Sequence, residues 1–286
     1  MTESPSRRLR SLLFAPASRP DVLAKLPRSA PDGVVIDLED AVPANGKVDA
    51  RPHALEAGRS IADAHPEIAV YVRINAVPTE WFADDIALGL SPAITGVIVP
   101  KLESFTQVDE VVEALHTHSL DHLGIVAGVE TAVGVEHAST VFAHERVDVA
   151  YFGAEDYVTD LGGVRTDTNQ EVLYARSRVA LAARVAGVHA VDQVVTVLDD
   201  EPRFLRDAAE GRSLGYRGKL CIHPAQVALA NRAFSSSPEE IDRATRLLAA
   251  FDDAAARGEA SIAFEGQMVD EPLARQARAV LAAAAG

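Results

Sequence analysis

Residues 124–156 of this 286-residue chain read GIVAGVETAVGVEHASTVFAHERVDVAYFGAED. Two short, mostly apolar runs, at 124–131 and 147–156, flank a segment with helical spacing at 136–144. Such near-continuous apolar runs are typical of parallel strands that are covered on both faces. A strand, a helix and a second strand in this order predict a βαβ unit, in which the two strands lie parallel.

The same alternation extends along most of the chain. Strand-like runs occur at residues 11–16, 33–40, 69–75, 96–101, 124–131, 147–156, 188–194 and 218–224. Helical patterns occur at residues 47–64, 105–116, 136–144, 171–186, 202–211, 225–233, 238–256 and 272–285. The repeat predicts an α/β fold, a (β/α)8 TIM barrel with extra C-terminal helices. A doubly wound open sheet is the alternative, although no GxGxxG loop follows the first strand.

The barrel is expected to occupy residues 1–256, followed by a linker and a last helix at 257–286. The net charge of −15 excludes non-specific binding to nucleic acid or to an anionic membrane, since both need clustered positive charge. No 18-residue apolar run predicts a transmembrane helix, and the first residues lack the apolar core of a signal peptide. The single cysteine, Cys221, suits a reducing compartment. We therefore expect a cytoplasmic protein.

Ionisable residues end several of the strand-like runs, and a TIM barrel places its active site at that end of its strands. Glu130 and Asp156 end two neighbouring runs. Two such carboxylates are able to share a hard cation while water and substrate oxygens complete its octahedron, which indicates Mg²⁺, with Mn²⁺ as a second candidate. Ordinary ion pairs at the rim are the alternative. Zinc is a weaker choice, because the histidines with ligand-like spacing, at 116, 118 and 122, precede a strand and belong at the opposite rim.

Arg73 lies within the apolar run YVRIN, so its guanidinium needs an anionic partner. Its fork of donors matches a substrate carboxylate. A structural pair with Asp37, Glu39 or Asp40 is the alternative, and both roles are compatible.

A second group of residues lies around the first βα connection. Phe14, Arg19 and Lys25 combine an aromatic ring with positive charge, and Lys47 and Arg51 follow the second strand. In so acidic a protein this pattern favours a site for the phosphates and ring of a nucleotide. A solvated helix face is the alternative interpretation.

These residues lie in blocks that resemble a known family. The blocks SLLFAPASRP, VVIDLEDAV, YVRIN, VIVPK, GVETAVGV, YFGAEDYVTDLG, LCIHPAQ and FEGQMVD occur in this order between Ser11 and Asp270. They resemble the citrate lyase β-subunit-like (CitE-like) branch of the HpcH/HpaI aldolase family, which includes malyl-CoA and citramalyl-CoA lyases. The resemblance implies a β/α barrel that assembles as a homotrimer, or as a hexamer of two trimers. It also implies Mg²⁺-dependent cleavage or formation of a C–C bond in a 3-hydroxy-acyl-CoA.

The resemblance implies roles for five residues at the expected rim. Glu130 and Asp156 match the metal ligands of the family. Glu39 and Asp40 match the acidic pair beneath the metal, and Arg73 matches the arginine that stabilises a substrate or enolate oxygen.

Four further residues match family positions that either contact coenzyme A or complete the site of a neighbouring subunit. Phe14, Arg19 and Lys25 match positions that contact coenzyme A. Asp270 matches an aspartate that is donated to the site of a neighbouring subunit, which would place the last helix on or in that subunit. Alternatively, or in addition, Asp270 caps that helix.

The activity that the resemblance implies is cleavage of malyl-, citramalyl- or citryl-CoA into acetyl-CoA, or a homologue, and a 2-oxo acid. Three alternatives remain open. The protein would otherwise be a malyl-CoA thioesterase, a citrate lyase β subunit that acts on a carrier-protein thioester, or a non-catalytic protein that binds CoA or a 2-oxo acid.

Overall fold

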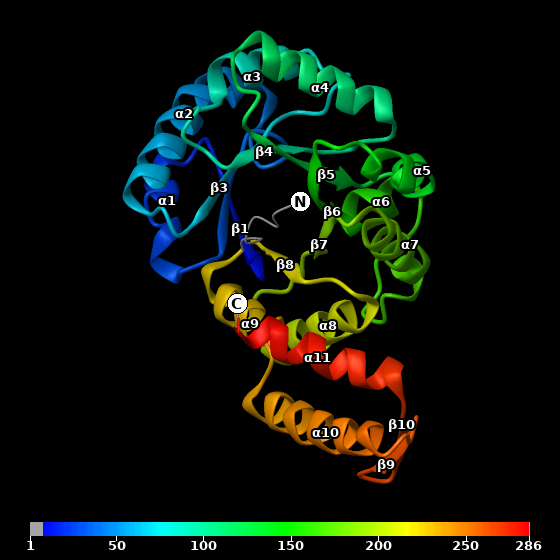
Figure 1. The fold of residues 1–286 in the computed structure, drawn as a ribbon. Helices are drawn as coiled ribbons and strands as arrows, with labels where there is room; N and C mark the ends of the chain where they lie inside the picture. The colour runs from blue at the N-terminus through cyan, green and yellow to red at the C-terminus, as the bar shows by residue number, and fades with distance from the viewer. Residues whose placement is uncertain (1–7, 286) are drawn as a thin grey trace. The chain divides into compact units, whose positions relative to one another are not determined.

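Parallel strands close on one another around a central core (Figure 1). The computed structural model describes residues 8–285, and within that range eight strands pair in chain order, with β8 returning to β1. They are β1 (Ser11–Pro16), β2 (Gly33–Asp37), β3 (Ala69–Arg73), β4 (Gly96–Val99), β5 (Gly124–Val129), β6 (Val147–Phe152), β7 (His189–Asp192) and β8 (Gly218–Cys221). This closed barrel confirms the TIM barrel prediction and excludes the open sheet.

Helices surround the barrel and follow its strands (Figure 1). In the barrel unit they are α1 (Pro20–Leu23), α2 (Lys47–Ala64), α3 (Phe82–Gly89), α4 (Phe105–Thr117), α5 (Ala132–Phe142), α6 (Ala154–Asp160), α7 (Gln170–Ala186), α8 (Glu201–Leu214) and α9 (Pro224–Ala233), with 3-10 turns η1 (Leu26–Ser29) and η2 (Ala44–Gly46). Side-chain caps start three of them, since Ser104, Thr131 and Asp200 each accept a hydrogen bond from a first-turn amide. None of the helices described between residues 8 and 285 has the length and apolarity to cross a membrane.

The strands end earlier than the sequence pattern predicts. The run predicted over 33–40 is a strand only to Asp37, and the run predicted over 147–156 only to Phe152. The structure also adds α1, α3 and α6, which no helical pattern predicts. These corrections share a cause, because at the mouth of the barrel the chain turns away from its neighbours and loses its ladder of hydrogen bonds. Polar rim residues therefore lie in the loops and short helices that follow the strands.

Residues 232–286 form a second compact unit, separate from residues 1–231. It contains α10 (Pro238–Ala256), α11 (Glu271–Ala285) and a hairpin of β9 (Ile262–Phe264) and β10 (Gln267–Val269). This division differs from the boundary expected after residue 256, because α10 shares an apolar core with β10 and α11.

The expected linker at 257–271 is also corrected by the structure, since it holds the β9–β10 hairpin. Glu265 and Gly266 between the two strands have φ of 48° and 78°. Positive φ at both residues is what a two-residue hairpin turn requires. Packing of the last helix on a neighbouring subunit stays a prediction.

Alternation along the barrel strands separates an apolar interior from a charged layer outside it. Val191 of β7 and Leu220 of β8 belong to the interior core. Their neighbours Asp192 and Lys219 therefore point outward, toward the helices, and both are fully buried there.

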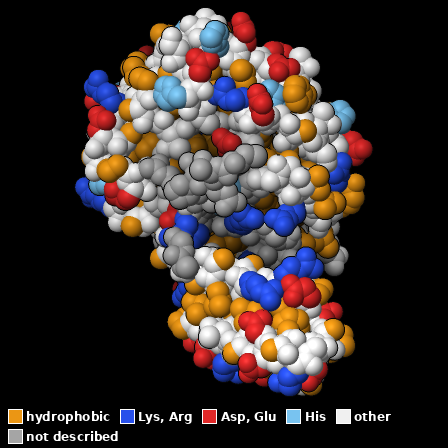
Figure 2. Space-filling model, in the orientation of Figure 1, with side chains coloured by type: hydrophobic (Ala, Val, Ile, Leu, Met, Phe, Trp, Pro, Cys, Tyr) orange, Lys and Arg blue, Asp and Glu red, His pale blue; other side chains and the backbone are white. Residues whose placement is uncertain are grey.

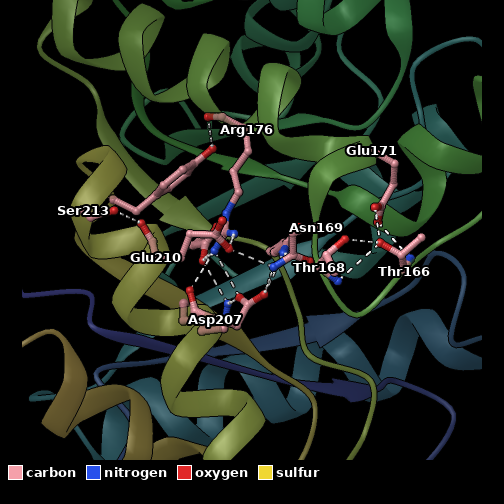
Figure 3. Close-up of polar contacts among 12 residues, drawn as sticks. Thr166, Thr168, Asn169, Glu171, Arg176, Asp207, Glu210 and Ser213 are labelled. Carbon is pink, nitrogen blue, oxygen red and sulfur yellow. Dashed lines mark hydrogen bonds and ion pairs between the residues drawn. The ribbon is translucent and has the colours of Figure 1, made fainter.

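The outer charges form one network with two helices (Figure 3). Arg176 of α7 donates to both carboxylate oxygens of Asp192, at 2.8 and 2.7 Å, and to Glu210 of α8 at 2.6 Å. Lys219 binds Asp192 at 2.9 Å and also binds Asp207 of α8. Burial raises the pKa of Asp207, but the charges of Lys219 and Arg176 outweigh it and lower that pKa to about 2. The network thus ties α7 and α8 to β7 and β8.

Apolar side chains also lie exposed on the outer face of α7. Tyr174, Leu181 and Val185 expose 68%, 59% and 78% of their surface. Their spacing of seven and four residues places them on one side of the helix. Figure 2 shows hydrophobic side chains gathered on the flank of the barrel where Figure 1 places α5 and α7. An exposed apolar stripe of this kind is typical of a protein contact surface.

We expect Asp207→Asn to lower the free energy of unfolding near pH 7 by about 3–5 kcal/mol, the usual cost of breaking a buried charge pair. An unfolded aspartate has a pKa of about 3.9, and the folded value lies at about 2. The contribution of ionised Asp207 is therefore complete above roughly pH 5 and is lost as the pH falls toward 2. The gap between wild type and variant should shrink over that range in urea titrations followed by circular dichroism.

The exposed aspartate Asp63 of α2 offers a matched control for this experiment. Asp63→Asn should leave the unfolding curve unchanged at each pH. A gap between wild type and Asp207→Asn that stayed constant down to about pH 2 would contradict the assigned role of Asp207.

Candidate active site

An ion pair between neighbouring strands lies at the mouth of the barrel. Asp37 ends β2 and stands opposite Arg73 at the end of β3. Arg73 donates from Nε to Asp37 Oδ1 at 2.8 Å and from Nη2 to Asp37 Oδ2 at 2.6 Å, and its Nη1 lies 3.0 Å from Glu39 Oε2. Burial alone lowers the pKa of Arg73, but Asp37 raises it well above its usual value. The structural pair predicted for Arg73 therefore exists, and Asp37 holds the guanidinium in place.

Phe14 of β1 is the aromatic neighbour of this ion pair. Its ring centroid lies 5.2 Å from the guanidinium carbon of Arg73, within cation–π range. The structure thus brings Phe14 to Arg73 at the barrel mouth.

Lys101 connects carboxylates that follow two different strands, β2 and β6. Its Nζ lies 2.6 Å from Glu39 Oε1, 3.4 Å from Asp40 Oδ2 and 3.8 Å from Asp156 Oδ1. Its backbone has φ of 53°, an uncommon conformation for lysine that often marks a functional site. Burial lowers the pKa of Lys101, but its carboxylate neighbours outweigh this and raise it. Lys101 is therefore the positive centre of an acidic cluster formed by Glu39, Asp40 and Asp156.

Glu130 follows β5 and is almost fully buried, at 1% exposure. Tyr151 of β6 donates its hydroxyl hydrogen to Glu130 Oε1. Oε2 of Glu130 is buried and accepts no hydrogen bond from any residue that the structure describes. Burial, and then the negative charge of Glu39, raise the pKa of Glu130 to about 8. A carboxylate with a buried, unpartnered oxygen is suited to a cation, which would stabilise its ionised form.

Asp156 differs from Glu130 in exposure and position. It lies in the first turn of α6, with 39% of its side chain exposed, and its charge contributes to the raised pKa of Glu130. The two carboxylates fit a hard divalent cation with exchangeable positions. Among residues 8–285, no three Asp, Glu, His or Cys side chains are arranged to hold a metal ion together.

The expected nucleotide-binding group is divided in the structure. Arg19 and Lys25 are exposed near α1, and both pair with Asp21, at 2.9 and 3.9 Å. Phe14 instead contacts Arg73. Arg19 and Lys25 therefore present positive charge to solvent near α1. The contact of Phe14 with Arg73 is a separate one.

Lys47 and Arg51 do not belong to a solvent-facing basic site, which corrects their interpretation from sequence. Lys47 is buried and donates to Asn75 Oδ1 at 2.6 Å. Arg51 is buried and donates to Asp85 Oδ1 at 2.8 Å. Both cations balance buried acceptors and fasten α2 to its neighbours.

Asp270 belongs to the C-terminal unit and directly precedes α11. It is half-buried, and its backbone carbonyl accepts a hydrogen bond from the amide of Ala274. This bond belongs to the first turn of the helix, as expected of a residue at a cap position.

A cavity of about 370 Å³ opens beside Glu155, the residue that precedes Asp156 in the chain. It is lined by Glu155, Arg165, Asn169 and Arg203, among others, and by none of the residues expected to bind metal. Arg165 donates to Glu155 at 2.9 Å, so Glu155 is drawn into this ion pair.

Sequence reasoning missed two residues of the site. Lys101 ends a strand-like run, and that position was a usable signal. Tyr151 carries no such signal, because within VDVAYFGAED it is indistinguishable from a core aromatic. Only the pairing of β5 with β6 brings its hydroxyl to Glu130.

Known proteins are similar to this chain in both sequence and fold. Residues 10–224 match the HpcH/HpaI aldolase/citrate lyase family. A citrate lyase subunit beta-like protein of Deinococcus radiodurans is 54% identical over 97% of this chain and 98% of its own length, and a (3S)-malyl-CoA thioesterase of Cereibacter sphaeroides is 33% identical over 96% and 94%. The structure of CitE from Mycobacterium tuberculosis in complex with magnesium, acetoacetate and coenzyme A is 33% identical, with a TM-score of 0.81 over 96% of this chain and 98% of that one. The chain therefore belongs to the HpcH/HpaI aldolase/citrate lyase family.

Proposed function

We propose that this protein is a magnesium-dependent carbon–carbon lyase that cleaves, or in reverse forms, a 3-hydroxy-acyl-CoA such as malyl-, citramalyl- or citryl-CoA. The products are acetyl-CoA, or a homologue, and a 2-oxo acid. One observation carries the proposal: Glu130 offers a buried, unpartnered oxygen and interacts electrostatically with Arg73 and Asp156 at the barrel mouth. Family membership supports the lyase class, and the CitE complex with magnesium and coenzyme A supports the choice of ligands.

In this proposal Glu130 and Asp156 hold the Mg²⁺ ion, for which Mn²⁺ would substitute. When bound, the ion polarises the substrate hydroxyl and carboxylate oxygens and lowers the pKa of the hydroxyl. Glu39 and Asp40 lie beside this pair. Lys101 contacts both and limits the repulsion among the carboxylates.

The side chains of the protein stabilise charge and move protons in the proposed reaction. A base takes the hydroxyl proton, and the electron pair left on that oxygen forms the C=O bond of the 2-oxo acid as the C2–C3 bond breaks. The electrons of the broken bond pass into the thioester, whose carbonyl oxygen carries the negative charge of the enolate. Arg73, held in place by Asp37, would stabilise that negative oxygen. Asp270 would donate the proton that converts the enolate carbon to the methyl group of acetyl-CoA, and would remove it in the reverse direction.

Coenzyme A is proposed to bind along the first βα connection. Arg19 and Lys25 are exposed there and carry the positive charge that its phosphates need. Phe14 supplies an apolar ring at the barrel mouth, where it contacts Arg73.

We also propose that the chain forms a homotrimer, or a hexamer, in which Asp270 completes the site of a neighbouring subunit. The apolar stripe on α7, formed by Tyr174, Leu181 and Val185, supports association, because an exposed face of this kind is commonly covered by another protein surface.

Two related activities have specific support. The similarity to a (3S)-malyl-CoA thioesterase favours hydrolysis of the thioester as an alternative. The similarity to a citrate lyase subunit beta-like protein favours a citryl thioester on an acyl carrier protein.

A product assay distinguishes these activities from one another. With malyl-CoA and Mg²⁺, we expect equal amounts of glyoxylate and acetyl-CoA, measured by mass spectrometry. Malate and free CoA without glyoxylate would identify a thioesterase. Turnover only with carrier-protein thioesters would identify a citrate lyase subunit, and no turnover on a panel of 3-hydroxy-acyl-CoAs would indicate a binding protein.

Removal of either proposed metal ligand should abolish metal-dependent turnover. We expect Glu130→Gln and Asp156→Asn each to lower kcat by roughly 100-fold or more, because loss of even an outer-shell partner commonly costs 10–100-fold. Glu136→Gln alters an exposed carboxylate of α5 and serves as the control. Wild-type turnover in either ligand variant would show that the metal assignment is wrong.

Mixed oligomers test whether Asp270 acts between subunits. Asp270→Asn alone should bind CoA but lack activity, and Glu130→Gln alone should also be inactive. Co-refolding the two in equal amounts should restore about a quarter of wild-type activity, because a quarter of the shared sites then combine an intact residue from each subunit. Mixing Glu130→Gln with Asp156→Asn should restore none, since both changes lie in one barrel. An active monomer would contradict the shared site.

A further inference from the structure

We propose that Tyr151 is a positioning residue that restricts Glu130 to binding a metal ion through one oxygen, and that this restriction makes the site prefer Mg²⁺ over Ca²⁺. The inference rests on the proposed metal site of Glu130 and Asp156. It concerns the selectivity of that site, which the proposed activity by itself does not determine.

The hydrogen bond of Tyr151 divides the two oxygens of Glu130 into different roles. The tyrosine hydroxyl is the donor and Oε1 is its acceptor, the direction that also holds once a bound cation stabilises the ionised carboxylate, which only accepts hydrogen bonds. Oε2 is the oxygen without a partner among the described residues. Tyr151 is 2% exposed and Glu130 is 1% exposed, so water does not readily replace either group. One oxygen is therefore engaged and the other is available.

Two glycines make room for this arrangement. Gly128 of β5 stands opposite Tyr151 of β6, and a Cβ at Gly128 would lie 2.6 Å from the tyrosine hydroxyl and 2.9 Å from Glu130 Oε1. A Cβ at Gly153 would lie 2.6 Å from Cγ of Glu130. Real Cβ atoms do not approach so closely, so a side chain at either glycine would displace the hydrogen-bonded pair. The backbone is shaped to the Tyr151–Glu130 contact.

The number of oxygens that Glu130 offers bears on the choice of metal. Ca²⁺ takes six to eight oxygen ligands and readily accepts both oxygens of one carboxylate, whereas Mg²⁺ takes six in a strict octahedron and keeps several waters. A glutamate that offers one oxygen suits Mg²⁺ and deprives Ca²⁺ of a ligand. Tyr151 achieves this by occupying Oε1, without contributing a ligand itself.

Metal binding in the absence of substrate tests this inference. Free Mn²⁺ is measured by its electron paramagnetic resonance signal, and Mg²⁺ or Ca²⁺ is titrated to displace Mn²⁺ from the protein. In the wild type Mg²⁺ should displace Mn²⁺ at lower concentration than Ca²⁺. In Tyr151→Phe the ratio of the Ca²⁺ to the Mg²⁺ dissociation constant should fall roughly tenfold, an effect typical of removing an outer-shell partner.

Tyr216→Phe is the matched control. Tyr216 is also 2% exposed, and its hydroxyl donates to the backbone oxygen of Arg176 at 2.8 Å, within the outer charge network. It should lose a similar amount of thermal stability and keep the wild-type ratio. Gly128→Ala is a second variant that should lower the ratio as Tyr151→Phe does, because its methyl group displaces the hydroxyl.

The outcomes separate this inference from the proposed function. Suppose that Glu130→Gln abolishes metal binding, but that Tyr151→Phe and Gly128→Ala keep the wild-type ratio of the Ca²⁺ to the Mg²⁺ dissociation constant. This result would overturn the inference and leave the proposed metal site intact. Metal binding that persists in Glu130→Gln would overturn the proposed metal site, and this inference with it. A reduced ratio in both variants and a wild-type ratio in Tyr216→Phe would support the role of Tyr151.

Discussion

The bidentate ion pair between Arg73 and Asp37 is the interaction on which the rest of the site depends. It follows from strand register, because β2 and β3 pair so that these two residues stand directly opposite at the carboxyl end of the barrel. A shift of register by one residue would turn one of the two side chains toward the other side of the sheet. Because Asp37 holds the guanidinium of Arg73 in place, Glu39 and Phe14 also contact it.

Two groups of buried charges in the barrel unit differ in how fully their members are satisfied. Outside the sheet, Arg176 and Lys219 each bind carboxylates on more than one element, and they lower the pKa of Asp207. At the mouth, Glu130 keeps an unpartnered oxygen and a raised pKa. The first arrangement joins helices to the sheet. The second has the features of a site that awaits a ligand, since a protein rarely leaves a buried carboxylate oxygen unpaired without a function for it.

Two glycines leave the space that functional side chains of the site occupy. Tyr151 reaches Glu130 because Gly128 leaves space across the strand pair, and Glu130 adopts its position because Gly153 leaves space beside it. The tyrosine and the glutamate fill the space beside these glycines, and this close packing defines the orientation of the carboxylate. A functional side chain held in this way by its surroundings is expected at a binding site, where geometry must be fixed.

The sequence by itself determined the alternation of strands and helices, and it predicted a barrel and the strand ends at which ionisable residues gather. Closure of the sheet, against the alternative of an open one, was decided by the tertiary structure. The sequence also predicted Glu130, Asp156 and Arg73 as site residues, because ionisable residues in or at the ends of apolar runs are a local signal. Tertiary structure alone decided which partner each residue meets: Asp37 for Arg73, and Tyr151 for Glu130. The physical reason is that the periodicity of a strand sets which face a side chain occupies, whereas cross-strand register and the space left by glycines set what it touches.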